Sequence, residues 1–196
     1  MRLDDKQYEE IKQIVSDTFV EYDVKSIPIN AFEIAYKMGL KVVPYSSVAS
    51  KKREACEMFT NDGFSVEFGN GDWVIYYNDS CNNYGRISQT VMHEIGHYAL
   101  GHIESGDEEE AEASFFAKYA LAPPPLIHRL YGMIGASITV DLIMKQFDIS
   151  YTAAENALRY YQMWITYGNE AYTDYEIQIL DQFDKQKYDK TSGLFI

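Results

Sequence analysis

Cysteine is scarce in this chain, and long apolar runs are missing. The only two cysteines, Cys56 and Cys81, lack the C-x-x-C spacing of a metal or redox pair. An isolated pair is weak evidence for an oxidising compartment, so we expect both thiols to be reduced. No window approaches 18 consecutive apolar residues, and the first residues include Asp4 and Asp5 rather than an apolar segment. These absences predict a cytoplasmic protein with no secretory signal and no membrane partner.

Basic residues are also few. Lys and Arg total 17 against 30 Asp and Glu, which gives a net charge of −13. This charge disfavours direct binding to nucleic acid or anionic lipid, and it would steer a basic protein partner toward the surface. Because many proteins are acidic for solubility alone, the charge favours a basic partner without identifying one. The sequence also has no nucleotide-binding glycine loop and no internal repeat.

The length of 196 residues and the hydrophobic content of 46% predict one core. We expect a single domain over residues 1–165, helical from about residue 124, followed by an acidic helix or tail over residues 166–196. Apolar spacing predicts helices at 140–147 and 153–161, joined by a short turn as in a helix-turn-helix. The second carries one basic residue, Arg159, whereas a recognition helix needs several groups that reach bases and phosphates. We therefore expect packing or substrate docking there, with DNA reading as the alternative.

Apolar periodicity predicts an α+β fold that is mostly helical. Residues 6–22 have the three- and four-residue spacing of an amphipathic helix, and a shorter helix is expected from Asn30 to a stop at Gly39. Strands are expected at 41–45, 64–68 and 73–78, with Asn70-Gly71 as a hairpin turn between the last two. The prediction is a small three-stranded antiparallel sheet beside the helix that follows it.

The most informative segment, His93 to His102, holds three of the four histidines within ten residues. Its first five residues read H-E-x-x-H. On an α-helix, His93 and His97 lie one turn apart on the same face, so their imidazoles can bind one metal ion. Glu94 then reaches the rim of that site as a general base, as in zinc hydrolases. The motif predicts one Zn²⁺ per chain and a zinc-activated water that attacks a carbonyl.

The helix around the motif is apolar except for one polar stripe. A helical wheel places Val91, Ile95 and Tyr98 on one face and the motif residues together on another. A solvated face is the alternative interpretation, but such a face usually carries several Lys and Glu. Between Ser88 and His102 there is no Lys and only one carboxylate. The pattern favours a buried helix whose polar stripe faces a cleft.

A catalytic zinc needs a third protein ligand. The metzincin pattern H-E-x-x-H-x-x-G-x-x-H is excluded, because Leu100 and Ile103 stand where its Gly and its third His would be. His102 lies about 180° round the helix from His93, so it is interpreted as a packed or helix-terminal histidine. The alternative source of a ligand is a carboxylate from the following helix.

The stretch Ser105-Gly106-Asp107-Glu108 matches a capping box and predicts that helix. Acids in its first turn are favoured by the macrodipole and would by default be solvated. Glu112 differs, because it lies one turn before Phe116 on the apolar arc, where a carboxylate needs a partner. Glu112 is therefore the predicted third ligand, with Glu108 and Glu109 as alternatives one turn earlier.

The stretch Glu112-Ala113-Ser114-Phe115-Phe116-Ala117, which ends at Leu121-Ala122-Pro123, resembles the E-A-N-x-F-A…L-L-M-P block of the ImmA/IrrE family of zinc metallo-endopeptidases. In that family the block follows an H-E-x-G-H helix, and its leading Glu is the third zinc ligand. The resemblance covers roughly residues 8–163. It implies metal binding by His93, His97 and Glu112 and catalysis by Glu94. Ser114 stands where the family has Asn or Asp, and Ala122 where it has Met.

The substrate is implied by the resemblance alone. Similar proteins cleave helix-turn-helix transcriptional repressors, which relieves repression in phage and other mobile elements or in stress responses. The expected partner is thus a DNA-binding repressor. For substrate binding we expect the strand that carries Trp73, Ile75 and Tyr77 to hold an extended peptide by β-augmentation, with packing on the sheet as the alternative. Arg86 either orients the substrate or forms a structural ion pair.

Two other functions remain open on the sequence. One is a catalytically silent zinc-binding regulatory or adaptor protein, against which the presence of Glu94 argues. The other is a zinc amidohydrolase with a non-peptide substrate. A shallow enclosed pocket would favour the amidohydrolase, whereas an open groove beside the 73–78 strand would favour a peptidase.

Overall fold

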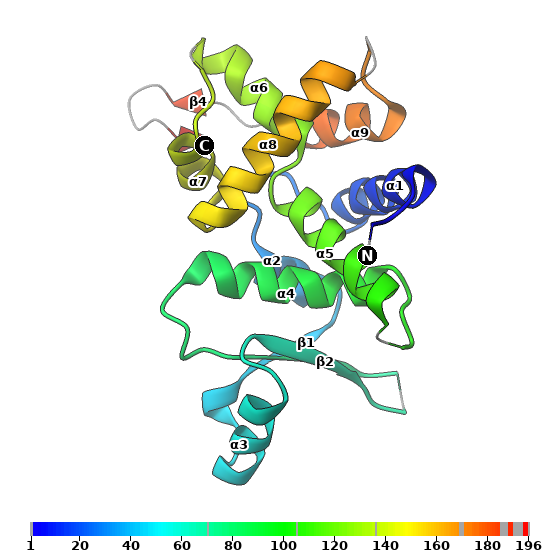
Figure 1. Ribbon diagram of the computed structural model, residues 1–196, viewed down its shortest axis with the longest axis vertical. Coiled ribbons are helices and arrows are strands. Elements are labelled where there is room, and N and C mark those ends of the chain that lie inside the picture. Colours follow the sequence, from blue (N-terminus) through cyan, green and yellow to red (C-terminus); the bar gives the residue numbers. More distant parts are fainter. Residues whose placement is uncertain are drawn as a thin grey trace.

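A three-stranded sheet and the long helix beside it organise the fold (Figure 1). The structure is a computed structural model that describes residues 2–69, 71–104, 106–135, 137–168 and 171–184, and the backbone of two short strands near the C-terminus. The sheet consists of β1 (Lys41–Pro44), β2 (Gly63–Glu67) and β3 (Trp73–Tyr77), in the order β1-β3-β2. The remaining elements are mostly helices, which confirms the predicted α+β class.

The sheet is mixed, whereas the sequence predicted a purely antiparallel one. β2 and β3 form the expected antiparallel hairpin, with Ser65 opposite Ile75. β1 pairs in parallel with β3, with Val42 opposite Ile75. The reason is the long connection after β1, which contains the turn η1 (Tyr45–Ser47) and the helix α3 (Ser50–Phe59) and returns the chain to the far edge of the sheet. In the predicted hairpin turn Asn70-Gly71, Gly71 has a φ of 84°, whereas Asn70 lies outside the described residues.

The part of the chain that the structure describes contains nine helices. Besides α3 they are α1 (Asp5–Glu21), α2 (Ala31–Lys37), α4 (Tyr84–Ala99), α5 (Asp107–Leu121), α6 (Pro124–Ile134), α7 (Val140–Phe147), α8 (Tyr151–Tyr167) and α9 (Asp174–Phe183). The short strands β4 (Tyr188–Asp189) and β5 (Leu194–Phe195) pair with each other. The first helix, expected at 6–22, spans Asp5–Glu21. The predicted start and stop of α2 are confirmed, since Asn30 caps it and Gly39 follows it with a φ of 76°.

The helix α4 lies between the sheet and most of the other helices (Figure 1). Val91 and Ile95 are fully buried on its apolar face, as the wheel predicted. They belong to one core cluster with residues from α1, α5, α6 and α8, among them Phe116 and Leu126. Because α4 is packed on two sides, the direction of its polar stripe is fixed.

The C-terminal segment packs onto the first helix. Ser16 on α1 donates a hydrogen bond to the carbonyl oxygen of Tyr175 on α9 at 3.0 Å, and the rings of Phe19 and Phe183 lie 5.6 Å apart. The helix α8 continues to Tyr167, through the expected boundary after residue 165. That boundary stays a prediction. No described helix is both long and apolar enough to cross a bilayer.

The first turn of α4 meets the α7–α8 turn at Gly85. A Cβ at Gly85 would lie 2.5 Å from the backbone nitrogen of Ser150 and 2.8 Å from the carbonyl carbon of Ile149. Since both atoms belong to the backbone, they cannot move aside as a side chain would. The absence of a side chain at Gly85 therefore lets α4 pack against this turn.

Gly85→Ala is expected to destabilise the protein by about 1–3 kcal/mol, because overpacking forces the backbone to shift. Gly132→Ala is the matched control, since Gly132 is also helical and a Cβ there would meet nothing within 4 Å. The control should be neutral or stabilising by up to about 1 kcal/mol. Chemical denaturation measures both free energies of unfolding. Equal stability of Gly85→Ala and the wild type would contradict this packing.

Candidate metal centre

The helix α4 holds His93 and His97 on its cleft-facing stripe. The side chain of Asn83 caps the helix by accepting a hydrogen bond from the backbone nitrogen of Arg86 at 3.1 Å. The Nε2 atoms of the two histidines lie 3.1 Å apart. Both rings are largely removed from solvent, with side-chain exposures of 19% for His93 and 9% for His97. The two nitrogens thus converge on one point.

Glu110, in the first turn of α5, completes a group of three ligand atoms. Its carboxylate oxygens lie 3.2 Å from His93 Nε2 and 3.5 Å from His97 Nε2. These residues could hold a metal ion, because one ligand atom from each lies within 4.8 Å of the others. Tetrahedral zinc, with ligands at ~2.0–2.2 Å, separates them by about 3.3 Å, so the observed spacing suits zinc.

Glu112, the ligand predicted from the sequence, has protein partners instead. One of its carboxylate oxygens lies 3.0 Å from His102 Nε2, and the other accepts a hydrogen bond from Gln7 of α1 at 3.0 Å. Two residues along a helix correspond to a rotation of about 200°, so a helix that turns Glu110 toward α4 turns Glu112 away from it. The alternatives Glu108 and Glu109 are likewise outside the group, and Glu108 accepts a hydrogen bond from Gln7. The geometry favours Glu110 as the third ligand.

His102 lies directly behind His97, although the helical wheel placed it on the opposite face. The wheel does not apply to it because α4 ends at Ala99 and the chain turns at Gly101, whose φ is 71°. The backbone nitrogen of His102 then donates to the carbonyl oxygen of His97 at 3.0 Å, and the two Nδ1 atoms lie 2.9 Å apart. His102 is thus a helix-terminal histidine, as interpreted, and it also contacts the candidate site.

Each of the two candidate imidazole ligands has a polar partner at Nδ1, the ring nitrogen that does not face the metal site. His97 Nδ1 contacts His102, whose other nitrogen contacts Glu112, and His93 Nδ1 lies 3.4 Å from the hydroxyl of Ser114. With Nδ1 of His97 as the donor, a chain of two hydrogen bonds runs from His97 through His102 to the Glu112 carboxylate. Such contacts orient metal-binding histidines and leave Nε2 free for the ion. Glu112 thus reaches the site through His102.

Gly96 lets α5 approach α4 closely enough for this arrangement. A Cβ at Gly96 would lie 3.2 Å from the Cα and carbonyl oxygen of Ala113 and from Cβ of Phe116. Ser114 follows Glu110 by four residues, so both project from the same face of α5 toward the histidines. That spacing is the sequence signal that could have identified Glu110.

Glu94 is buried beside the histidines and is hydrogen-bonded to the sheet. Ser65 of β2 donates to its carboxylate at 2.7 Å. Burial raises the pKa of Glu94 to about 7, although the hydrogen bonds from Ser65 act in the opposite direction. A carboxyl group with such a pKa can exchange a proton near neutral pH. Sequence reasoning found Glu94 but not Ser65.

Burial also lowers the pKa values of both histidines. For His93 the desolvation outweighs the attraction of Glu110, and for His97 desolvation and the neighbouring His93 lower the pKa to about 4. Both imidazoles are therefore neutral at pH 7, which is the form that binds a metal ion.

A cleft of about 750 Å³ contains the group and runs along β2. Gly63, Ser65 and Glu67 line it, as do His93, Glu94 and Glu110. β2 is at the edge of the sheet, and no described strand pairs with its outer side. An edge strand beside a cleft is a site at which an extended peptide can add by backbone hydrogen bonds.

The predicted substrate strand, β3, is the central strand and is paired on both sides. Its backbone therefore cannot add a peptide, and we correct that prediction in favour of β2. Ile75 is fully buried, and the ring of Tyr77 packs against Phe32 at 5.4 Å. Trp73 does line the cleft, where its ring contacts Tyr98. Of these three residues, only Trp73 is placed to contact a ligand in the cleft.

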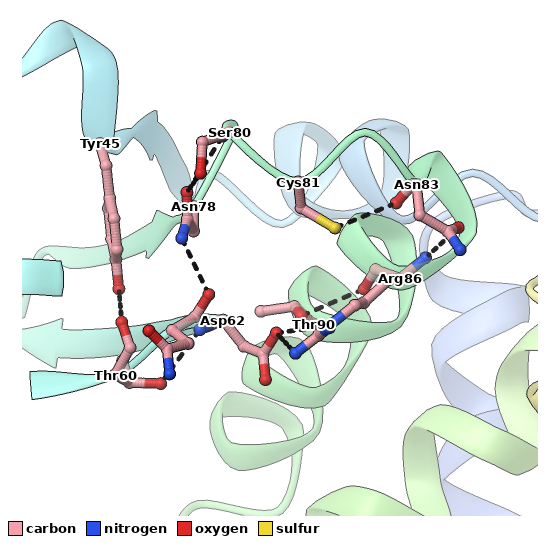
Figure 2. A network of polar contacts seen from close by, with 10 residues as sticks. Tyr45, Thr60, Asp62, Asn78, Ser80, Cys81, Asn83, Arg86 and Thr90 are labelled. Atoms are coloured by element: carbon pink, nitrogen blue, oxygen red, sulfur yellow. Dashed lines mark hydrogen bonds and ion pairs between the residues drawn. The ribbon is translucent and has the colours of Figure 1, made fainter.

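Arg86 forms the structural ion pair that was one of its two predicted roles. Its guanidinium lies 2.7 Å from the carboxylate of Asp62, just before β2 (Figure 2). The same close-up shows Thr90 donating to the carbonyl oxygen of Arg86, one turn back along α4. Arg86 also lines the cleft. The ion pair joins α4 to the start of the edge strand.

Comparisons with protein-family models and with curated proteins found no match for this chain.

Proposed function

We propose that this protein is a zinc-dependent endopeptidase. The observation that carries the proposal is the convergence of His93, His97 and Glu110 next to the buried carboxylate of Glu94, in a cleft along the edge strand β2. Two neutral imidazoles and one carboxylate are the donor set of catalytic zinc sites of the His₂Glu type. The H-E-x-x-H motif and the resemblance to the ImmA/IrrE family support the same conclusion. One Zn²⁺ per chain is the proposed cofactor.

Zinc held by these residues would supply Lewis acidity, which polarises a scissile carbonyl and makes water a nucleophile near neutral pH. Glu94 accepts the proton that the water loses and then donates it to the leaving amine. Ser65 keeps the Glu94 carboxylate in place through its hydrogen bond of 2.7 Å. His102 and Ser114 orient the two imidazoles.

The shape of the site favours a peptide over a small amide. The cleft extends along the whole of β2, from Gly63 to Glu67, rather than closing around the metal-binding atoms. An extended peptide paired with the outer edge of β2 would place a backbone carbonyl between that strand and α4. We therefore favour a peptidase over an amidohydrolase.

A helix-turn-helix repressor is the proposed substrate, on the resemblance alone. The net charge of −13 supports a basic protein partner of this kind, because opposite charges accelerate association. We propose a cytoplasmic location, supported by the two free cysteines Cys56 and Cys81.

The wild-type protein with zinc is expected to cleave internal bonds in a peptide library derived from a bacterial proteome, as identified by mass spectrometry. Cleavage should stop when a chelator removes the metal and return when zinc is added. Purified helix-turn-helix repressors, including those encoded beside the gene, test the substrate class in the same assay. A zinc-bound protein that leaves every peptide and every repressor intact would contradict the peptidase proposal.

A further inference from the structure

A small apolar cavity lies between α5 and α8, beside the cleft. Its volume is about 100 Å³, and its wall is largely aromatic and aliphatic. Phe115 and Tyr119 of α5 face Tyr160 and Ala157 of α8 across it, and Ile149 from the α7–α8 turn closes one side. The rings of Phe115 and Tyr160 lie 5.9 Å apart, as do those of Phe115 and Tyr119, so the wall is packed on itself.

The cavity adjoins the cleft. Four residues line both spaces, and we call this shared boundary the mouth of the cavity: Gln89, Lys118, Ala153 and Asn156. Gln89 precedes His93 by one turn of α4, a distance of about 6 Å along the helix axis. On α5, Lys118 follows Ser114 by one turn, and the Ser114 hydroxyl lies 3.4 Å from His93 Nδ1. The mouth is thus within one or two peptide residues of the candidate metal centre.

The direction of β2 indicates whether the cavity lies beside the substrate residues before the scissile bond or beside those after it. Gly63 approaches Thr90, and Ser65 binds Glu94, so β2 and α4 run in the same direction along the cleft. A peptide that pairs antiparallel with β2 therefore has its C-terminal part at the Gly63 end. Gln89 and the cavity mouth lie toward that end of α4, beyond His93.

We propose that this cavity is a specificity pocket for an aliphatic side chain of leucine size, carried by the substrate residue that follows the scissile bond. The proposal rests on the peptidase function proposed above. An apolar cavity of about 150 Å³ accommodates benzene, so a cavity of about 100 Å³ suits an aliphatic group better than an aromatic ring. The ammonium group of Lys118 at the mouth disfavours a cationic side chain, which would also lose its hydration inside.

The test uses three malonic acid hydroxamate amides that differ only at the central carbon, which carries hydrogen, an isobutyl group or a 4-aminobutyl group. Their affinities for the zinc-loaded protein are measured by calorimetry. The isobutyl probe is expected to bind about 10–100-fold more tightly than the unsubstituted one, as burial of a leucine side chain would provide. The 4-aminobutyl probe should gain nothing over the unsubstituted one.

Two variants fill the pocket and one serves as the matched control. Ala157→Leu occupies the interior and Ala153→Leu the mouth, while Glu155→Leu adds the same side chain to an exposed position of α8 outside both spaces. Both filled variants should lose the preference for isobutyl, which is measured on each variant as the ratio of its affinities for the isobutyl and unsubstituted probes. The control should keep that preference. Zinc content and helical circular dichroism, measured on each variant, establish that it is loaded and folded.

The proposal is overturned if the wild type binds the three probes equally, or if its preference for isobutyl survives in both filled variants. If the zinc-loaded protein cleaves peptides but binds the three probes equally, the pocket assignment is wrong and the proposed peptidase function still stands. A protein that binds neither zinc nor any hydroxamate would contradict the proposed function, and the pocket assignment with it.

Discussion

Glu94→Gln is expected to bind zinc as the wild type does and to cleave peptides at least about a hundredfold more slowly, the usual contribution of a general base. The amide of Gln cannot accept the proton that the attacking water must lose. Glu94 is not among the residues that could hold the ion, so the metal site should remain intact. Metal analysis of the purified variant and its rate on a peptide that the wild type cleaves measure the two properties separately.

Ser65→Ala is the control for this experiment. It removes the hydrogen bond of 2.7 Å to Glu94 but leaves the carboxylate in place. Its rate should therefore lie between those of the wild type and Glu94→Gln. If Glu94→Gln kept the full rate while retaining zinc, a different group would have to be the base, and the mechanism would be wrong.

Glu110→Gln is expected to weaken zinc binding more than any change at the neighbouring acids of α5. It replaces the carboxylate that lies 3.2 Å from His93 Nε2 and 3.5 Å from His97 Nε2. Glu112→Gln leaves these three ligand groups unchanged and disturbs the contacts of Glu112 with His102 and Gln7. Its loss of zinc affinity should therefore be about 10–100-fold, as is typical for contacts made behind the ligands. Competition with a chromogenic chelator measures the zinc affinity of each variant.

Asp107→Asn is the matched control, because Asp107 is an exposed acid in the first turn of the same helix and is not part of the candidate group. It removes the same formal charge and should leave zinc affinity close to that of the wild type. The order of affinities is therefore Asp107→Asn, then Glu112→Gln, then Glu110→Gln. The reverse order for the two Glu variants would return the ligand role to Glu112.

The sequence predicted the helices and strands where local signals agree. Apolar spacing placed α1 and α4, and Asn30 and Gly39 marked the ends of α2 through capping chemistry. It did not predict α3, none of whose residues is buried, because a helix without an apolar face lacks the periodicity on which the prediction depends. The parallel pairing of β1 was also missed, since alternation of side chains gives the face of a strand but not its direction.

In the candidate site, sequence reasoning suffices for residues on one continuous helix but not for the choice of a ligand where two segments meet. The His93 and His97 side chains are one turn apart on α4, so their convergence follows from helix geometry alone. The choice between Glu110 and Glu112 depends on the rotation of α5 about its own axis, and that rotation is set by packing at Gly96. The argument that a half-buried carboxylate needs a partner was sound for Glu112, but its partners are Gln7 and His102.

The role of the sheet was misplaced for a related reason. The position of β3 just before the H-E-x-x-H helix suggested a strand that binds substrate, yet an apolar strand of this kind is typical of the centre of a sheet, where both edges are paired. β2 contains the more polar sequence Gly63-Phe64-Ser65-Val66-Glu67 and occupies the edge. Ser65 and Ile75 lie opposite each other and project from the same face of the sheet, so only the order of the strands places Ser65 at the edge, beside the cleft, and Ile75 at the centre.

The central claim is that His93, His97 and Glu110 hold one zinc ion. A crystal structure of the zinc-loaded protein, with anomalous diffraction recorded at the zinc edge, tests it most directly. We expect one anomalous peak per chain, about 2.0–2.2 Å from Nε2 of both histidines and from a carboxylate oxygen of Glu110. A peak coordinated by Glu112 or His102, or no peak at the two histidines, would contradict the claim.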